Sequence, residues 1–157
     1  MKMQKATPKD CKLYAEIIRQ RQDWFISNLH PQWNDITKYY HEEYFLSKLD
    51  NFYAFYQNKE LIGGCFIFFE DKYWKNDKKS IYLHTFATTP AQKGLGKQAF
   101  DLVVKFAKDF DSIRIDCMGT NEKLINIYKG YGFQIVGWEK YSGGDSACLM
   151  EYIINNK

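Results

Sequence analysis

A glycine loop between an expected strand and an expected helix is the first part of the sequence that could do chemistry. The strand runs from Ile81 to Ala87, and the loop that follows carries Lys93, Gly94, Gly96 and Lys97. Glycine lets a ligand approach the backbone closely, and the first N–H groups of a helix have no intrahelical partner. This order of elements therefore favours an anion such as a pyrophosphate. Gly-x-Gly at a helix start is also common in ordinary turns, so the loop alone leaves both interpretations open.

Two other phosphate-binding loops are excluded. The loop is not a Walker loop, because no Gly-Lys-Ser/Thr follows at the required spacing. It also lacks the third glycine of the dinucleotide-binding fingerprint, and it comes too late in the chain for the first strand of a Rossmann unit.

A second candidate segment is the expected helix from Glu122 to Tyr131. Its larger apolar and aromatic residues recur at helical spacing, as in a core-facing stripe: Leu124, Ile127, Tyr128 and Tyr131. This stripe makes Tyr128 a plausible core residue, although its hydroxyl, with an ordinary pKa near 10, is also protonated at neutral pH. Asn121, directly before the helix, could cap its first turn or bind a ligand.

His84 is the candidate proton acceptor. It lies on the expected strand two residues before Phe86, and strict alternation would place both side chains on one face. A free imidazole has a pKa of about 6.5, which suits a general base, although a single strand histidine is often structural. Glu70 and Asp116 are the alternative proton acceptors.

The elements that must position these residues alternate between strands and helices. Thr7 and Pro8 suit the cap and first position of a helix over Lys9 to Arg21. A second helical region, broken near His30 and Pro31, is expected from Trp24 to Lys48, and a helix from Gly96 to Phe110. The expected strands are Met3 to Ala6, Phe52 to Gln57, Glu60 to Glu70, Ile81 to Ala87, Ser112 to Cys117, Phe133 to Lys140 and Ala147 to Ile154. This mixture predicts an α/β (α+β) domain with a mixed sheet.

Composition narrows the classes of protein further. The chain has 157 residues and a mass of 18.7 kDa, which predicts one domain over residues 1–157. Its 22 basic and 19 acidic residues are interspersed, so nucleic acid is not an expected partner. The longest apolar run, residues 61–69, is too short to cross a membrane, and the N-terminus does not read as a signal peptide; we expect a cytoplasmic protein. The four cysteines form no CxxC pair, and no metal site is expected.

The two candidate segments together resemble the motifs of the GCN5-related N-acetyltransferase (GNAT) superfamily. There a strand leads into Arg/Gln-x-x-Gly-x-Gly/Ala at a helix start, and a later segment reads Asn-x-x-Ala-x-x-Leu-Tyr-x-x-x-Gly-Phe. Gly94 and Gly96 match the first motif. The positions in register with the second are Asn121, Leu124, Ile127, Tyr128, Gly132 and Phe133. The resemblance is strong from Tyr82 to Trp138 and implies a mostly antiparallel central sheet with helices on both faces.

The resemblance also implies a role for each matching position. Acetyl-coenzyme A (acetyl-CoA), the co-substrate, would lie between the strands Ile81 to Ala87 and Ser112 to Cys117. Its pantetheine would pair with main-chain groups of Phe86 and Thr88. Tyr128 would hydrogen-bond or protonate the sulfur. The remaining cofactor contacts would come from the amides of Lys93, Gly94, Leu95, Gly96 and Lys97 and from the Asn121 side chain.

One position departs from the family motif. With the two glycines aligned, the Arg or Gln of the motif falls on Ala91, and Gln92 is one place late. The main-chain cradle does not depend on that side chain, so the departure concerns the strength of cofactor binding.

The resulting prediction is an N-acetyltransferase that moves an acetyl group directly from acetyl-CoA to a primary amine of a small molecule or peptide. Trp24 to Phe45, rich in aromatic and acidic residues, is where the family usually selects its acceptor: Trp33, Asp35, Tyr39, Tyr40, Glu42, Glu43 and Tyr44. A non-catalytic acyl-CoA sensor and a flavin- or nucleotide-binding protein are the alternatives. An unpaired sheet edge would also allow a homodimer.

Overall fold

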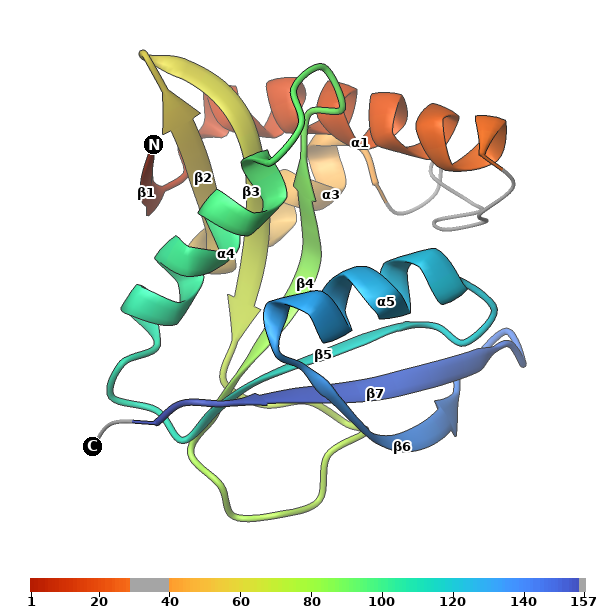
Figure 1. The fold of residues 1–157 in the computed structure, drawn as a ribbon. Coiled ribbons are helices and arrows are strands. Elements are labelled where there is room, and N and C mark those ends of the chain that lie inside the picture. Colours follow the sequence, from red (N-terminus) through yellow and green to blue (C-terminus); the bar gives the residue numbers. More distant parts are fainter. Residues whose placement is uncertain (29–39, 156–157) are drawn as a thin grey trace.

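The computed structural model describes residues 1–28 and 40–155. Seven strands form one sheet in the order β1-β2-β3-β4-β5-β7-β6. Their bounds are β1 Lys2–Lys5, β2 Phe52–Gln57, β3 Glu60–Phe68, β4 Ser80–Thr88, β5 Ser112–Met118, β6 Gln134–Lys140 and β7 Ser146–Ile153. Every neighbouring pair is antiparallel except β4 with β5 (Figure 1). The prediction of a mixed, mostly antiparallel sheet is confirmed.

Helices cover both faces of this sheet. α1 (Pro8–Ser27) and α3 (Glu42–Ser47) lie behind β2, β3 and β4 in Figure 1, whereas α4 (Leu95–Phe106) and α5 (Glu122–Tyr131) lie in front. A short 3-10 turn, η1 (Leu49–Asn51), leads from α3 into β2. None of the described helices is both long and apolar enough to cross a membrane.

Local sequence explains where most elements begin and turn. The Thr7 N–H donates to the Asp10 carboxylate at 2.7 Å, and Pro8 opens α1 as expected. The β2–β3 hairpin turns through Asn58 and Lys59, both of which have positive φ angles.

Two helices differ in length from their predictions. α1 continues six residues past Arg21, so Trp24 belongs to its last turns instead of starting a second helix. α4 ends at Phe106, where the helical hydrogen bonds stop, not at Phe110. His30, Pro31, Trp33, Asp35 and Tyr39 lie outside the described residues, so the expected break and part of the expected acceptor region are not placed.

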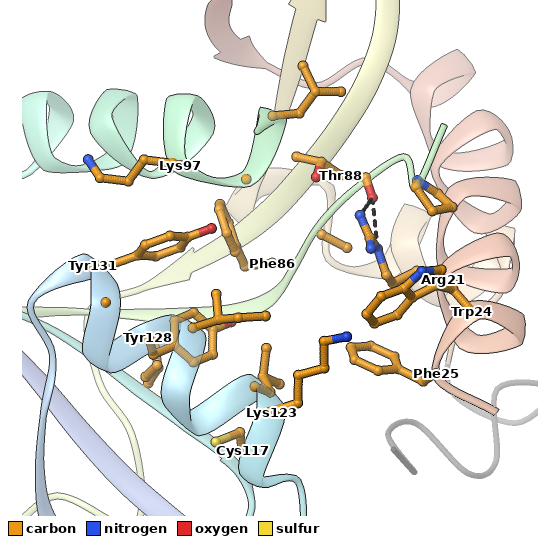
Figure 2. A pocket seen from close by; sticks show the side chains of 18 of the residues that line it. Arg21, Trp24, Phe25, Phe86, Thr88, Lys97, Cys117, Lys123, Tyr128 and Tyr131 are labelled. Carbon is orange, nitrogen blue, oxygen red and sulfur yellow. Dashed lines mark hydrogen bonds between the residues drawn. The ribbon is translucent and has the colours of Figure 1, made fainter. Parts of the chain in front are cut away.

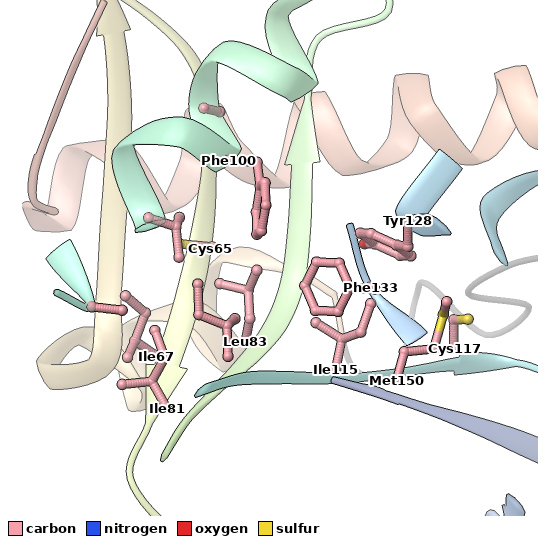
Figure 3. Packing of buried hydrophobic residues seen from close by; sticks show 14 of the residues in the cluster. Cys65, Ile67, Ile81, Leu83, Phe100, Ile115, Cys117, Tyr128, Phe133 and Met150 are labelled. Carbon is pink, nitrogen blue, oxygen red and sulfur yellow. The ribbon is translucent and has the colours of Figure 1, made fainter. Parts of the chain in front are cut away.

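Two hydrophobic clusters hold the layers together, one on each face of the sheet. The larger lies between α4, α5 and the sheet and includes Phe100, Leu83 and Ile115 (Figure 3). The smaller joins α1 and α3 to the other face through Tyr14, Phe45 and Phe52. All four cysteines are buried free thiols. Edge strand β6 exposes Val136 and Trp138, and the homodimer stays a prediction.

The feature of the fold that creates a site is the divergence of β4 from β5. The two strands pair only through Ser80–Ser112, Ile81–Ile113 and Tyr82–Arg114, and no further. Beyond these pairs β4 carries a bulge. Gly64 pairs with Ala87 and Phe66 pairs with His84, so four residues of β4 lie opposite three residues of β3. Thr85 within the bulge has a φ of 49°. The buried hydroxyl of Tyr14 lies between the carbonyls of Gly64 and Thr85 and braces the bulge from α1.

Candidate active site

A cavity of about 730 Å³ opens where β4 and β5 separate. One wall is β4 from Leu83 to Thr88, and the opposite wall is β5 at Ile115, Asp116 and Cys117. The β4–α4 loop, α5 and the C-terminal half of α1 close the remaining sides (Figure 2). The basic lining residues are Arg21, Lys93, Lys97 and Lys123, and the acidic one is Asp116. This predominance of positive charge suits an anionic ligand.

The glycine loop forms a main-chain cradle at one end of the cavity. The lining includes all five predicted positions, Lys93, Gly94, Leu95, Gly96 and Lys97, together with Phe86 and Thr88. Gly94 caps α4 with a φ of 84°, and a Cβ built there would project into open space. A Cβ on Gly96 would come within 2.8 Å of the Tyr131 hydroxyl. Because the first amides of α4 have no intrahelical acceptor, the cradle fits a pyrophosphate.

The predicted stripe on α5 faces the cavity. Leu124, Ile127, Tyr128 and Tyr131 all line it, and Tyr128 also packs against Phe133 at 5.5 Å between ring centroids (Figures 2 and 3). The two interpretations of this stripe are therefore compatible. Burial raises the pKa of Tyr128 well above its ordinary value, so the hydroxyl keeps its proton at neutral pH.

Asn121 does not line the cavity. It is fully buried at the start of α5, where its Oδ1 accepts a hydrogen bond from the Leu124 N–H at 3.1 Å. The structure thus shows the helix cap that the sequence offered as one of two roles, and a contact with the cofactor stays a prediction.

His84 and Phe86 do not share a face of β4, and the prediction that they do is wrong. The bulge at Thr85 shifts the alternation by one residue. Phe86 therefore packs against the cluster on the α4 side. His84 pairs across the sheet with Phe66 of the other cluster, and its ring lies 5.2 Å from that of Phe68.

On that other face His84 joins a polar cluster with Asp71, Asp116 and Tyr141. His84 Nε2 lies 2.8 Å from Asp71 Oδ2, and the Tyr141 hydroxyl donates to Asp116 Oδ1 at 2.6 Å. One ligand atom from each of Asp71, His84 and Asp116 lies within 4.8 Å of the others. Since Asp116 also lines the cavity, this cluster borders the cavity through Asp116, on the face of the sheet opposite the α4-side core.

The two carboxylates of the cluster differ electrostatically. Burial raises the pKa of Asp116 above its ordinary value, and the hydrogen bond from Tyr141 only partly opposes this. Burial acts in the same direction on Asp71, but hydrogen bonds from His84 and the Tyr73 N–H lower its pKa below the ordinary value. The Asp71 carboxylate is therefore ionised at neutral pH and oriented toward the imidazole. Spacing alone would let the three residues hold a metal ion, yet an oxygen of each carboxylate is already engaged in these hydrogen bonds.

Comparison with known families agrees with this geometry. The model described as "Acetyltransferase (GNAT) family" matches residues 18–133, from the cavity-lining half of α1 to the end of the second sequence motif. The chain belongs to the GNAT family. It is therefore an acetyltransferase by family, and the resemblance found in the sequence is confirmed.

Solved GNAT structures share the fold across nearly the whole chain. The GNAT acetyltransferase from Listeria monocytogenes 4b F2365 has a TM-score of 0.70 at 24% identity, covering 96% of this chain and 94% of its own. The one from Streptococcus agalactiae 2603 has a TM-score of 0.81 at 14% identity, covering 97% and 94%. A protein from Salmonella typhimurium, solved with its cofactor acetyl-CoA, has a TM-score of 0.67 at 16% identity, covering 100% and 95%. A comparison with curated proteins gives no match.

Several residues of the GNAT site were not found from the sequence. Asp71 lies in the β3–β4 connection and Tyr141 in the β6–β7 connection, where no periodic pattern points to them. Arg21 and Phe25 could have been found, because a longer α1 puts Arg21, Trp24 and Phe25 on one helix face. Lys123 lines the cavity from α5, and no sequence signal pointed to it.

Proposed function

We propose that this GNAT protein transfers the acetyl group of acetyl-CoA directly to a primary amine. The observation that carries the proposal is the cavity between β4 and β5, which has the main-chain cradle at one end and Tyr128 and Asp116 in its walls. A thioester held in this gap would be reached by an amine from the face of His84. No covalent acetyl-enzyme is required.

The binding half of the proposal uses the backbone. Acetyl-CoA supplies an activated acetyl thioester. The amides at the start of α4 would hold its pyrophosphate, and main-chain groups of Phe86 and Thr88 would pair with the pantetheine as an added strand does. The early end of the β4–β5 pairing supports this, because the β5-facing edge of β4 beyond Tyr82 has no partner among the described strands. The Thr88 carbonyl oxygen already accepts two hydrogen bonds from Arg21, so Thr88 would contribute its N–H.

The chemical half needs one proton acceptor and one proton donor. The nitrogen lone pair of the neutral amine attacks the thioester carbonyl carbon, the new C–N bond forms, and the C–S bond breaks. The departing thiolate takes the hydroxyl proton of Tyr128, which burial keeps protonated before the reaction. The proton released by the amine nitrogen goes to His84.

Asp71 supports His84 in this role. Its side chain is only 8% exposed, and its carboxylate orients the imidazole through the 2.8 Å hydrogen bond. Asp116 lies beside the imidazole, where its carboxylate would attract an incoming ammonium group. That group would lose one proton to solvent before the neutral amine attacks. We propose no metal ion in this step.

The test measures coenzyme A (CoA) affinity and thiol release on the same proteins. Wild type should bind acetyl-CoA in a calorimetric titration and release thiol in the presence of a suitable amine. Tyr128→Phe and His84→Gln should each lower turnover by about 10²- to 10⁴-fold, the usual contribution of a general acid or base, with little change in CoA affinity. Added EDTA should leave turnover unchanged.

Two outcomes would contradict the proposal. Tight acetyl-CoA binding without turnover on any amine of a broad panel would favour the non-catalytic sensor. Unchanged turnover in both variants would remove Tyr128 and His84 from the chemistry while leaving the family assignment intact.

A further inference from the structure

Arg21 projects from α1 into the wall of the cavity next to the glycine loop. Its Nε and Nη2 donate to the Thr88 carbonyl oxygen at 3.1 and 2.8 Å, where β4 ends and the loop begins (Figure 2). Its guanidinium also lies 5.3 Å from the centre of the Trp24 ring, which fixes the side chain along the helix. The guanidinium is therefore held at the same end of the cavity as the cradle.

The charge of Arg21 has no counter-charge in the part of the chain that is described. Each ion pair found there involves other residues, and the one acceptor of Arg21 is the neutral carbonyl of Thr88. Burial lowers the pKa of Arg21, which reflects the cost of desolvating this charge. Nη1 makes no hydrogen bond to a described residue. A half-buried guanidinium with donors to spare, on a cavity wall, matches the geometry of an oxyanion.

The loop lacks the Arg or Gln of the GNAT motif, and its cationic side chains are those of the exposed Lys93 and Lys97. Position 91, where the GNAT motif has Arg or Gln, is an exposed alanine that does not line the cavity. Its neighbour Gln92 does line the cavity, but its amide is neutral. A guanidinium next to this loop comes instead from α1, which lies more than 60 residues earlier in the chain.

We propose that Arg21 binds the pyrophosphate of CoA and takes the place of the missing Arg or Gln at position 91. The cradle amides and the guanidinium would then hold the diphosphate from two sides, the loop through its main chain and α1 through a charged side chain. This inference rests on the CoA binding of the proposed function.

The experiment compares two ligands on matched variants by calorimetry. CoA carries the pyrophosphate, and pantetheine lacks it. Arg21→Gln keeps a donor for the Thr88 carbonyl but removes the charge, whereas Arg19→Gln removes an exposed arginine of the same helix that does not line the cavity. Arg21→Gln should weaken CoA binding about 10- to 100-fold and leave pantetheine binding unchanged, because a charge-assisted hydrogen bond is lost. Arg19→Gln should change neither.

A second variant tests whether an arginine at position 91 can replace Arg21. Adding Ala91→Arg to Arg21→Gln should restore most of the CoA affinity, as expected if both positions reach the same phosphates. Tighter CoA binding by Arg21→Gln would show that Arg21 blocks the site, and equal weakening of both ligands would show that it only shapes the end of β4. A larger loss in Gln92→Ala than in Arg21→Gln would also overturn the inference. If wild type binds neither ligand, the proposed function itself fails, whereas any of the other three results overturns only the role of Arg21.

Discussion

Arg114 and Asp116 lie two residues apart on one face of β5, and the protein surrounds these two charged side chains very differently. Arg114 is fully buried, with its Nε donating to Glu151 at 2.7 Å, its Nη1 donating to the Tyr82 hydroxyl at 2.8 Å, and the Trp74 ring 4.5 Å from its guanidinium. Asp116 has a phenol as its hydrogen-bond partner and no cation in ion-pair contact among the described residues.

The pKa values of the Glu151 and Asp116 carboxylates are shifted in opposite directions. Burial would raise the pKa of Glu151, but hydrogen bonds from Arg114, Lys78 and Ser112 lower it below the ordinary value. Burial raises the pKa of Asp116, and Tyr141 does not compensate. We call the hydrogen-bonded group of Arg114, Glu151, Lys78 and Ser112 the complete network; it connects the β3–β4 connection to β5 and β7, where the strands are paired. The incomplete network of Asp116 and Tyr141 lies where β4 and β5 diverge. The comparison teaches that charge compensation distinguishes the part of β5 that supports the sheet from the part that lines the cavity.

Breaking the complete network should have the largest effect. Arg114→Met leaves the Glu151 carboxylate buried without its main partner and should reduce the free energy of unfolding by about 3–5 kcal/mol. Urea unfolding followed by circular dichroism measures this. The double variant Arg114→Met/Glu151→Leu removes both charges and should recover much of the loss. A single variant as stable as wild type would mean that the network contributes specificity but no net stability.

Glu151→Gln should have a smaller effect that depends on pH. The folded-state pKa of Glu151 lies below its unfolded value, so the carboxylate stabilises the fold above about pH 4.3 and this contribution is lost as the pH falls through the folded pKa. At pH 7 the variant should be less stable than wild type by roughly 2 kcal/mol, the scale of a charged hydrogen bond. Thermal unfolding between pH 3 and pH 7 should show the two proteins converging in acid. A constant difference across this range would contradict the assignment.

The regions of the molecule also differ in how far the sequence could predict them. Strand and helix periodicity placed every element of the sheet, and α5 agrees with its prediction from Glu122 to Tyr131. The glycine cradle was predictable because its proposed function depends on main-chain amides whose position follows from a strand, a loop and a helix in that order.

The polar cluster was not predictable in the same way. Strand alternation failed at Thr85, because its bulge is stabilised by Tyr14, about 70 residues away in sequence. Asp71 and Tyr141 reach His84 and Asp116 from connections between strands, so their meeting depends on the register of four strands. Arg21 was hidden for a simpler reason, since the helix that carries it was expected to end there.

Asp116→Asn should have the smallest effect on stability, and its sign should be the reverse of that at Glu151. Because the folded-state pKa of Asp116 is raised, its carboxylate destabilises the fold increasingly as the pH rises above about 3.9, the ordinary aspartate value. The asparagine keeps an acceptor for the Tyr141 hydroxyl but carries no charge, so the variant should gain roughly 1 kcal/mol at pH 7 and match wild type near pH 3. The same thermal scans measure this, and thiol release should fall even as stability rises, because an attractive charge for the incoming ammonium is lost. A variant that loses stability at pH 7 would show that Asp116 is compensated by a contact other than Tyr141, and the contrast with Glu151 would then disappear.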